Sequence, residues 1–168
     1  AKQLERWGLP LKEAVHLTNP LSVEEEYLRS SLIPTMLTTI EQNQRLFSSG
    51  ALFELAPVWQ WRKKGELPQQ KMSLLIATYG PDGKEAFAKA KGIVERLSKE
   101  SGLGGLNTTT LKAVGPHWHP ARYGQLETQQ KVAIGTIGQV AESAAQAFGL
   151  EQHVVLVELD FDTLVPLF

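Results

Sequence analysis

Two histidines, His117 and His119, flank a tryptophan in the second half of the chain. Side chains at i and i+2 of a strand point to the same face, so this pair could share a metal ion. A metal site needs at least a third ligand, and no further His, Asp or Glu lies close in the sequence. Pro120 follows directly and indicates a turn. We therefore expect partly buried imidazoles that make hydrogen bonds in a turn, and no metal-binding residues.

Two glycine-rich segments are candidates for phosphate binding, because a helix N-terminus beside such a loop presents free backbone N–H groups. The first, residues 102–105, follows a predicted helix and is better explained as the stop of that helix. The second, residues 135–138, precedes a predicted helix. It lacks the Lys-Ser/Thr of a P-loop and the complete G-x-G-x-x-G pattern. We expect no cofactor-binding residues in either segment.

Charged residues offer three weaker candidates. Arg62-Lys63-Lys64 could contact phosphates, but a solvated hairpin tip explains it better, and Glu24-Glu25-Glu26 suits a solvated helix start. Glu158 and Asp160 would share one face of a strand, where surface placement is a better explanation than acid–base catalysis. Cysteine nucleophiles and the G-x-S-x-G elbow are both absent. Local chemistry alone predicts a domain without a visible active site.

Length and composition narrow the possible classes of protein. The 168 residues provide room for one domain, residues 1–168, with a buried core. Seventeen Lys and Arg nearly balance 18 Asp and Glu, so no net positive field would attract nucleic acid. The absence of cysteine excludes disulfides and thiolate metal sites and fits a reducing compartment. No apolar run approaches the roughly 18 residues that span a bilayer, and we expect no membrane association.

Hydrophobic periodicity predicts an α+β fold, an antiparallel or mixed sheet with inserted helices. Pro34 in the first turn and a cap from Ser30 or Ser31 favour a helix that runs to Phe47. Ser22 and Glu25 form a capping-box pattern, which predicts a helical turn. The other expected helices cover residues 1–9, 84–100 and 141–148. The expected strands cover residues 15–18, 52–61, 71–79, 107–114, 123–127, 131–137 and 154–161.

Several segments in a fixed order carry a family resemblance. Asn19-Pro20-Leu21-Ser22, residues 28–34, Asn43 and residues 52–59 resemble the bacterial phenylalanyl-tRNA synthetase beta subunit. That family has Asn-Pro-Leu-Ser, a Leu-Arg-Thr-Ser-Leu-Leu-Pro-Gly helix start and a Leu-Phe-Glu-Ile-Gly strand. Later matches extend the resemblance over nearly the whole chain: residues 91–95, 119–122, 134–140 and 157–160. The departures are Ser30 for Thr, and Thr35 and Ala56 for Gly.

The resemblance implies a class II aminoacyl-tRNA synthetase-like fold, an antiparallel sheet flanked by helices. It also implies that the catalytic residues are absent. Active class II enzymes carry an aromatic-Arg-x-Glu motif, and here Trp59 is followed by Gln60, with Arg62 in the place of Glu. A second arginine position aligns loosely with Thr163. An arginine fork binds carboxylate and phosphate, each charged hydrogen bond contributing roughly 1.5–3 kcal/mol, and Gln supplies no charge.

The same resemblance predicts the biological role. The chain would be a cytoplasmic, catalytic-like but inactive domain of the beta subunit of phenylalanine–tRNA ligase. It would support the alpha subunit, which charges tRNA with phenylalanine using ATP and magnesium, in an (αβ)₂ heterotetramer. The first helix and strand of the full domain are expected to be missing, and both ends of the chain indicate an excised fragment. The alternative is a free-standing synthetase-like paralogue that binds an amino acid or a nucleotide.

Overall fold

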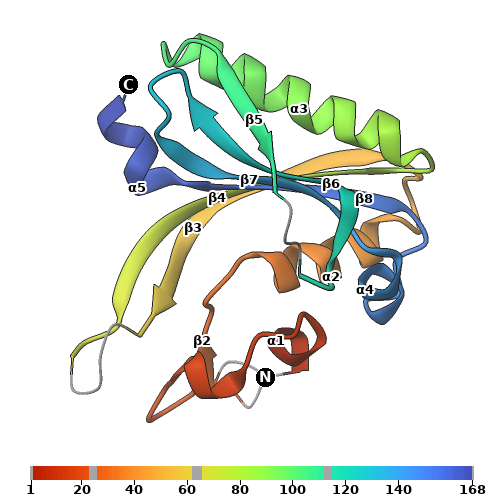
Figure 1. Ribbon diagram of the computed structural model, residues 1–168. Helices are drawn as coiled ribbons and strands as arrows, with labels where there is room; N and C mark the ends of the chain where they lie inside the picture. The colour runs from red at the N-terminus through yellow and green to blue at the C-terminus, as the bar shows by residue number, and fades with distance from the viewer. Residues whose placement is uncertain (1, 23–25, 62–65, 112–114, 168) are drawn as a thin grey trace.

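A six-stranded antiparallel sheet forms the centre of the molecule (Figure 1). The computed structural model describes residues 2–22, 26–61, 66–111 and 115–167. The strand order is β3-β4-β8-β7-β6-β5. The bounds are β3 Gly50–Gln60, β4 Gln69–Gly80, β5 Leu106–Thr110, β6 Trp118–Thr128, β7 Ala133–Val140 and β8 His153–Asp160. The predicted α+β class and the antiparallel sheet are confirmed.

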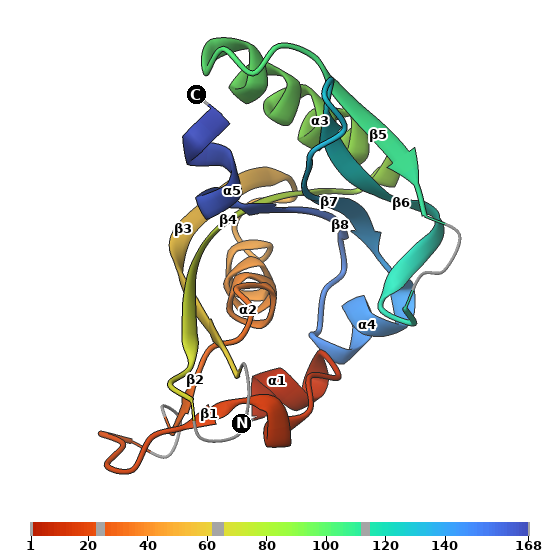
Figure 2. The same cartoon turned by 60° about the vertical axis from the view of Figure 1, so that its left-hand side comes forward.

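Helices cover both faces of this sheet (Figures 1 and 2). Helix α3, Gly83–Glu100, packs on one face, while α2, Ile33–Asn43, and α4, Glu142–Ala147, lie on the other. Residues 74–77 of β4 and 154–157 of β8 are continuously apolar and buried, because helices cover these central strands from both sides. The remaining short elements are α1 Lys2–Arg6, η1 Leu11–Glu13, β1 Val15–His16, β2 Tyr27–Leu28, α5 Phe161–Leu164 and η3 Val165–Leu167.

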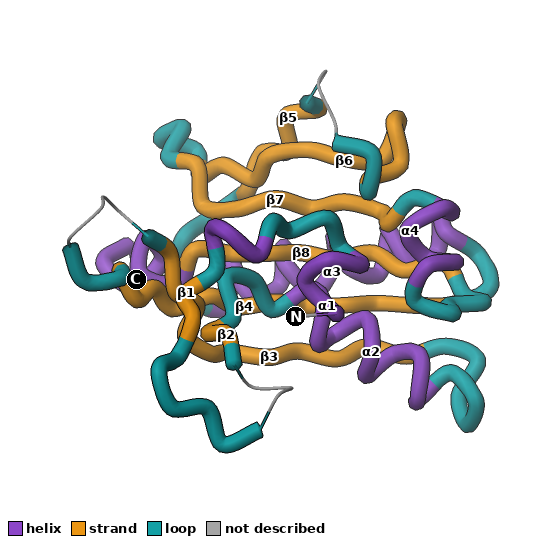
Figure 3. The backbone as a smooth tube through the Cα atoms, turned by 90° about the horizontal axis from the view of Figure 1, so that it is seen from below, coloured by secondary structure: helices purple, strands orange, loops and turns teal. Residues whose placement is uncertain are grey.

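Helix α2 begins near its predicted start, with Leu32 rather than Ser30 or Ser31 in the N-cap position, and it ends early. Pro34 lies in its first turn, and the Ser31 hydroxyl accepts a hydrogen bond from the Ile33 N–H at 3.2 Å. Its apolar side chains are buried against β3 and β4, and Figure 3 shows the helix lying against the β3 side of the sheet. The predicted extension to Phe47 is wrong. The helix ends at Asn43, residues 44–46 form a turn, and Phe47 is 59% exposed.

Helix α3 matches its prediction closely. The Asp82 carboxylate accepts hydrogen bonds from the backbone N–H groups of Lys84 and Glu85, which lower the pKa of Asp82. Small residues, Ala86 and Ala90, face the sheet and let the helix pack close to it. The helix ends before Gly102, whose φ of 80° suits glycine. The segment 102–105 is therefore a helix stop, as expected.

Three other local predictions have different outcomes. The turn expected at Pro120 is wrong, because β6 begins at Trp118 and continues through Pro120. Pairing with β7 shifts register between Trp118 and Tyr123, and this irregularity accommodates a residue without an N–H.

The capping box of Ser22 and Glu25 falls partly on residues 23–25, outside the described residues. The expected strand 107–114 is confirmed over its first four residues as part of β5.

Gly138 provides a test of the packing on the α2 side of the sheet. A Cβ at Gly138 would lie 2.5 Å from Tyr123 Cδ2 and 2.6 Å from Trp118 Cε3, whose rings pack against each other. We expect Gly138→Ala to destabilise the protein by about 1–3 kcal/mol through overpacking, measured by urea unfolding. Gly92→Ala, on the exposed side of α3 with no atom near its Cβ, is the control and should stabilise by about 0.4–1 kcal/mol. Equal effects would contradict this packing account.

Candidate functional site

A row of polar side chains crosses the sheet on the face covered by α2. The strand registers align Glu54 with Leu75, Leu75 with Glu158, Glu158 with Thr136, Thr136 with Gln125, and Gln125 with Thr109. Residues paired directly across neighbouring strands point to the same face. We call the five polar members the polar row: Glu54, Thr109, Gln125, Thr136 and Glu158.

The polar row borders an apolar surface. Two residues along the strands, toward α4, the same face carries Leu52, Ala77, Leu156 and Gly138. Ala77 and Leu156 are fully or almost fully buried in the core with α2. Polar side chains in such a row on an otherwise apolar face are unusual for a purely structural sheet, and they make this face the first place to look for ligand chemistry.

Arg29 fixes one end of the polar row. Its NH1 donates to Glu54 Oε1 at 2.6 Å, and its Nε donates to the Pro57 carbonyl at 3.1 Å. Its own carbonyl accepts the Trp59 N–H at 2.9 Å. These three bonds, which we call the Arg29 clamp, fasten the segment after β2 along the outer edge of β3. The Arg29 charge is thereby neutralised by Glu54.

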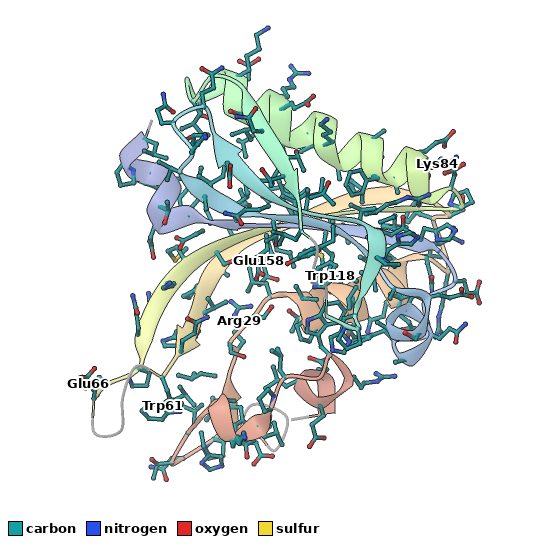
Figure 4. The ribbon with its side chains drawn as sticks, viewed as in Figure 1. Arg29, Trp61, Glu66, Lys84, Trp118 and Glu158 are labelled. Atoms are coloured by element: carbon teal, nitrogen blue, oxygen red, sulfur yellow. The ribbon has the colours of Figure 1, made fainter. Side chains whose placement is uncertain are left out.

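Glu158 occupies the centre of the polar row. Burial raises the pKa of its carboxyl, and the hydrogen bond from the Ser31 hydroxyl, at 3.5 Å, acts in the opposite direction. Figure 4 shows Arg29 and Glu158 on the same side of the sheet, toward β1 and β2. The N-terminal segment therefore brings one basic and one hydroxyl side chain over two carboxylates of the sheet.

A second paired group lies beside the end of β8. Lys71 Nζ is 4.0 Å from Asp160 Oδ2, and Asp160 Oδ1 accepts the Thr163 N–H at the start of α5. Asp162 Oδ2 accepts the Met72 N–H at 2.9 Å. Among the described residues of this face, both cations that we find, Arg29 and Lys71, are paired with carboxylates.

The structure places the two expected arginine replacements on different elements. Gln60 is the exposed last residue of β3 and pairs with Gln69 on β4. Thr163 lies in α5, bonded to Asp160 as described above. Arg62, with the rest of the basic run 62–64, is outside the described residues. That Gln60 and Thr163 stand where catalytic arginines would be remains a prediction from the resemblance.

Sequence reasoning missed the residues that organise this face. Arg29, Ser31 and Glu54 all lie inside the segments that carry the resemblance, but local patterns identify them only as cap, turn and strand residues. Their partners lie 25 or more residues away in the sequence. Strand register alone brings Glu54 and Glu158 into one row, and register could not be derived from the sequence. Glu158 and Asp160, for which surface placement was expected, are half-buried, and Glu158 lies within hydrogen-bonding distance of the Ser31 hydroxyl.

The remaining candidates do not form a site together. The His117 ring packs on Trp7, with centroids 5.0 Å apart, while His119 Nδ1 accepts the Ala121 N–H. Within the described ranges, no group of three His, Asp or Glu side chains could hold a metal ion. Residues 135–138 lie inside β7, in extended strand, so they form no loop at a helix N-terminus. No helix in the described parts of the chain is long and apolar enough to cross a membrane.

Comparison with known proteins identifies the family. The sequence profile described as "Phenylalanyl tRNA synthetase beta chain CLM domain" matches residues 1–161. The chain belongs to this family. The phenylalanine–tRNA ligase beta subunit of Syntrophotalea carbinolica is 31% identical over 170 residues, covering 93% of this chain and 20% of that protein. The beta subunit of Xanthomonas campestris pv. campestris is 30% identical over 175 residues, covering 98% and 22%. The chain thus spans about a fifth of the length of these relatives.

Solved structures agree with this family assignment at the level of fold. A pyrrolysyl-tRNA synthetase from Desulfitobacterium hafniense superposes with a TM-score of 0.77 at 14% identity, covering 98% of this chain and 57% of that one. A second pyrrolysyl-tRNA synthetase structure from the same organism gives the same TM-score at 11% identity. The predicted class II synthetase-like fold is therefore confirmed for this chain.

Glu158→Gln tests the electrostatics of the polar row. Because its pKa is raised by folding from an ordinary value of 4.5, the folded protein holds this proton more tightly than the unfolded chain. Stability should therefore fall as the pH rises from about 4.5 through the folded pKa, and stay lower above it. Glu158→Gln removes this loss. In urea unfolding at a series of pH values, the advantage of the Gln variant should grow with pH and then level off.

Ser31→Ala serves as the companion variant. It removes the hydrogen bond that lowers the Glu158 pKa, so the pH-dependent loss should move to higher pH. The pH-independent cost of losing the bond to Ile33 should appear whether or not Glu158 is present. If the difference in stability between Glu158→Gln and the unchanged protein did not vary with pH, this would contradict a raised pKa of Glu158.

Proposed function

We propose that this chain is a non-catalytic, synthetase-like domain of a phenylalanine–tRNA ligase beta subunit. In this role it supports an alpha subunit that carries the active site and charges tRNA with phenylalanine, using ATP and magnesium. The family assignment and the names of the relatives support the subunit, and the synthetase fold supports a derivation from a catalytic domain. The proposal that this domain is not catalytic rests on the charged side chains of the sheet face covered by α2.

The pairing of the face's cations is the observation that carries this proposal. Aminoacyl activation requires unpaired positive groups, because ATP and the carboxylate of the amino acid are both anions. Arg29 is held by Glu54, and Lys71 lies against Asp160. Glu158 adds a further carboxyl to the same face. An ATP phosphate approaching the described part of this face would meet carboxylates whose neighbouring cations are already engaged.

The residues at the ends of β3 and α5 support the same conclusion. Gln60 follows the aromatic Trp59, where the family resemblance expects an arginine in active enzymes, and Thr163 stands near the second such position. An amide and a hydroxyl donate hydrogen bonds but neutralise no charge, and neither reproduces a bidentate guanidinium. Without either arginine, the negative charge that develops on the phosphate during the reaction would not be neutralised.

Phenylalanine-dependent ATP–pyrophosphate exchange tests the proposal directly. The purified chain should give exchange no higher than the reaction without enzyme, with phenylalanine or with any other standard amino acid. An active class II synthetase in the same assay serves as the positive control. Turnover above background with phenylalanine would contradict a non-catalytic domain. Turnover with another amino acid would instead support a free-standing synthetase-like enzyme.

A further inference from the structure

A large cavity lies at the end of the sheet where β8 begins, away from the Arg29 clamp. It has a volume of about 710 Å³, which is in the range of small-molecule sites in proteins. Residues from the start of α3, from β6, from α4 and from the start of β8 line it. The basic and imidazole side chains among them are Lys84, His119, Arg122 and His153. We call these four residues the donor cluster.

A buried amide orients two members of the donor cluster. Gln139 is 4% exposed, and its Oε1 accepts a hydrogen bond from Arg122 NH1. With its oxygen engaged by Arg122, the NH₂ group of Gln139 is the donor toward His153 Nδ1, at 3.4 Å. The neutral His153 ring then carries its proton on Nε2 and is itself a donor. Gly83, the first residue of α3, leaves room for the Gln139 side chain, because a Cβ at position 83 would lie 2.7 Å from Gln139 Oε1.

The other members of the donor cluster also have hydrogen-bond donors that the protein does not use. His119 Nδ1 accepts the Ala121 N–H at 3.1 Å, so the neutral ring carries its proton on Nε2. Arg122 makes one side-chain hydrogen bond and no ion pair among the described residues, which leaves most of its five N–H groups available. Lys84 likewise has no ion-pair partner in the described parts of the chain.

The carboxylates of the cavity limit what can bind. Asp82 accepts hydrogen bonds from two backbone N–H groups of α3 and lies close enough to Lys84 and Arg122 for their charges to contribute to its lowered pKa. Glu142 accepts a hydrogen bond from Gln146. Glu151 also lines the cavity. Its negative charge would repel a second anionic group next to a bound one. A ligand with one compact anionic group therefore fits better than a polyphosphate or a nucleic-acid backbone.

We propose that this cavity binds the phosphate group of a small phosphate monoester. The donor cluster comes from three elements, α3, β6 and β8, and lines one cavity. A tetrahedral phosphate accepts hydrogen bonds from several directions, whereas a carboxylate accepts them in one plane. Arg122 supplies the bidentate fork, and Gln139 is a positioning residue that holds it. This site is independent of the proposed synthetase role.

Isothermal titration of the full chain with glycerol 3-phosphate tests the proposal, with glycerol and acetate as comparison ligands. Saturable binding of the phosphate ester is expected, with no binding of glycerol and weaker binding of acetate. Arg122→Gln should weaken the phosphate affinity about tenfold or more, because charged hydrogen bonds are lost. Gln139→Leu should weaken it as well, since the fork is no longer held. Arg96→Gln, on the exposed side of α3, is the matched control and should leave the affinity unchanged.

Four results would overturn the proposal: no saturable binding of glycerol 3-phosphate, equal affinity for acetate, unchanged affinity in Arg122→Gln, or tighter binding of tRNA through the same residues. Thermal unfolding of each variant establishes that it is folded. If Arg122→Gln does not fold, Arg122→Lys keeps the charge but removes the fork, and an intermediate loss of affinity is expected. Phosphorus NMR of the bound ester gives a readout that a merely structural role of Arg122 would not change.

Discussion

The Arg29 clamp is the constraint on which the rest of this face depends. The Arg29 side chain donates hydrogen bonds to the Glu54 carboxylate and to the Pro57 carbonyl of β3. The Arg29 carbonyl accepts a hydrogen bond from the Trp59 N–H. An outer strand with unpaired backbone groups would otherwise be open to pairing with another chain. The clamp covers part of that edge and at the same time sets the segment that delivers Ser31 above Glu158. The same residue therefore covers part of the sheet edge and pairs with a carboxylate of the face.

The proposed non-catalytic role combines a synthetase fold with paired charges on this face. The antiparallel sheet and the long hairpin of β3 and β4 give the chain the fold of a synthetase. On the face covered by α2, basic groups are paired to carboxylates, and a half-buried glutamate lies at the centre. The fold needs only the apolar surfaces between the sheet, α2 and α3, so polar residues on the open part of the face are free to vary.

Much of the fold could be predicted from the sequence, for identifiable reasons. Helix α3 has a capping aspartate, helical spacing of apolar residues and glycines at its end, and its predicted bounds are correct within one residue. Phe47 misled the prediction for α2, because an apolar residue in register with a helix does not have to be in it. Pro120 misled the prediction for β6, because a strand tolerates proline where its pairing is irregular. The polar row and the donor cluster depend on contacts between distant strands, which no local pattern encodes.

Residue-resolved NMR of the chain during titration with magnesium and ATP tests the central claim most directly. The claim is that the sheet face covered by α2 does not bind ATP, because its cations Arg29 and Lys71 are paired with carboxylates. The account predicts that the amide signals of Arg29, Glu54, Lys71 and Glu158 stay in place throughout the titration. Shifts confined to the cavity around Arg122 would leave the claim intact, because that cavity lies away from the Arg29 clamp. Saturable shifts at Arg29, Glu54 and Glu158 would contradict it.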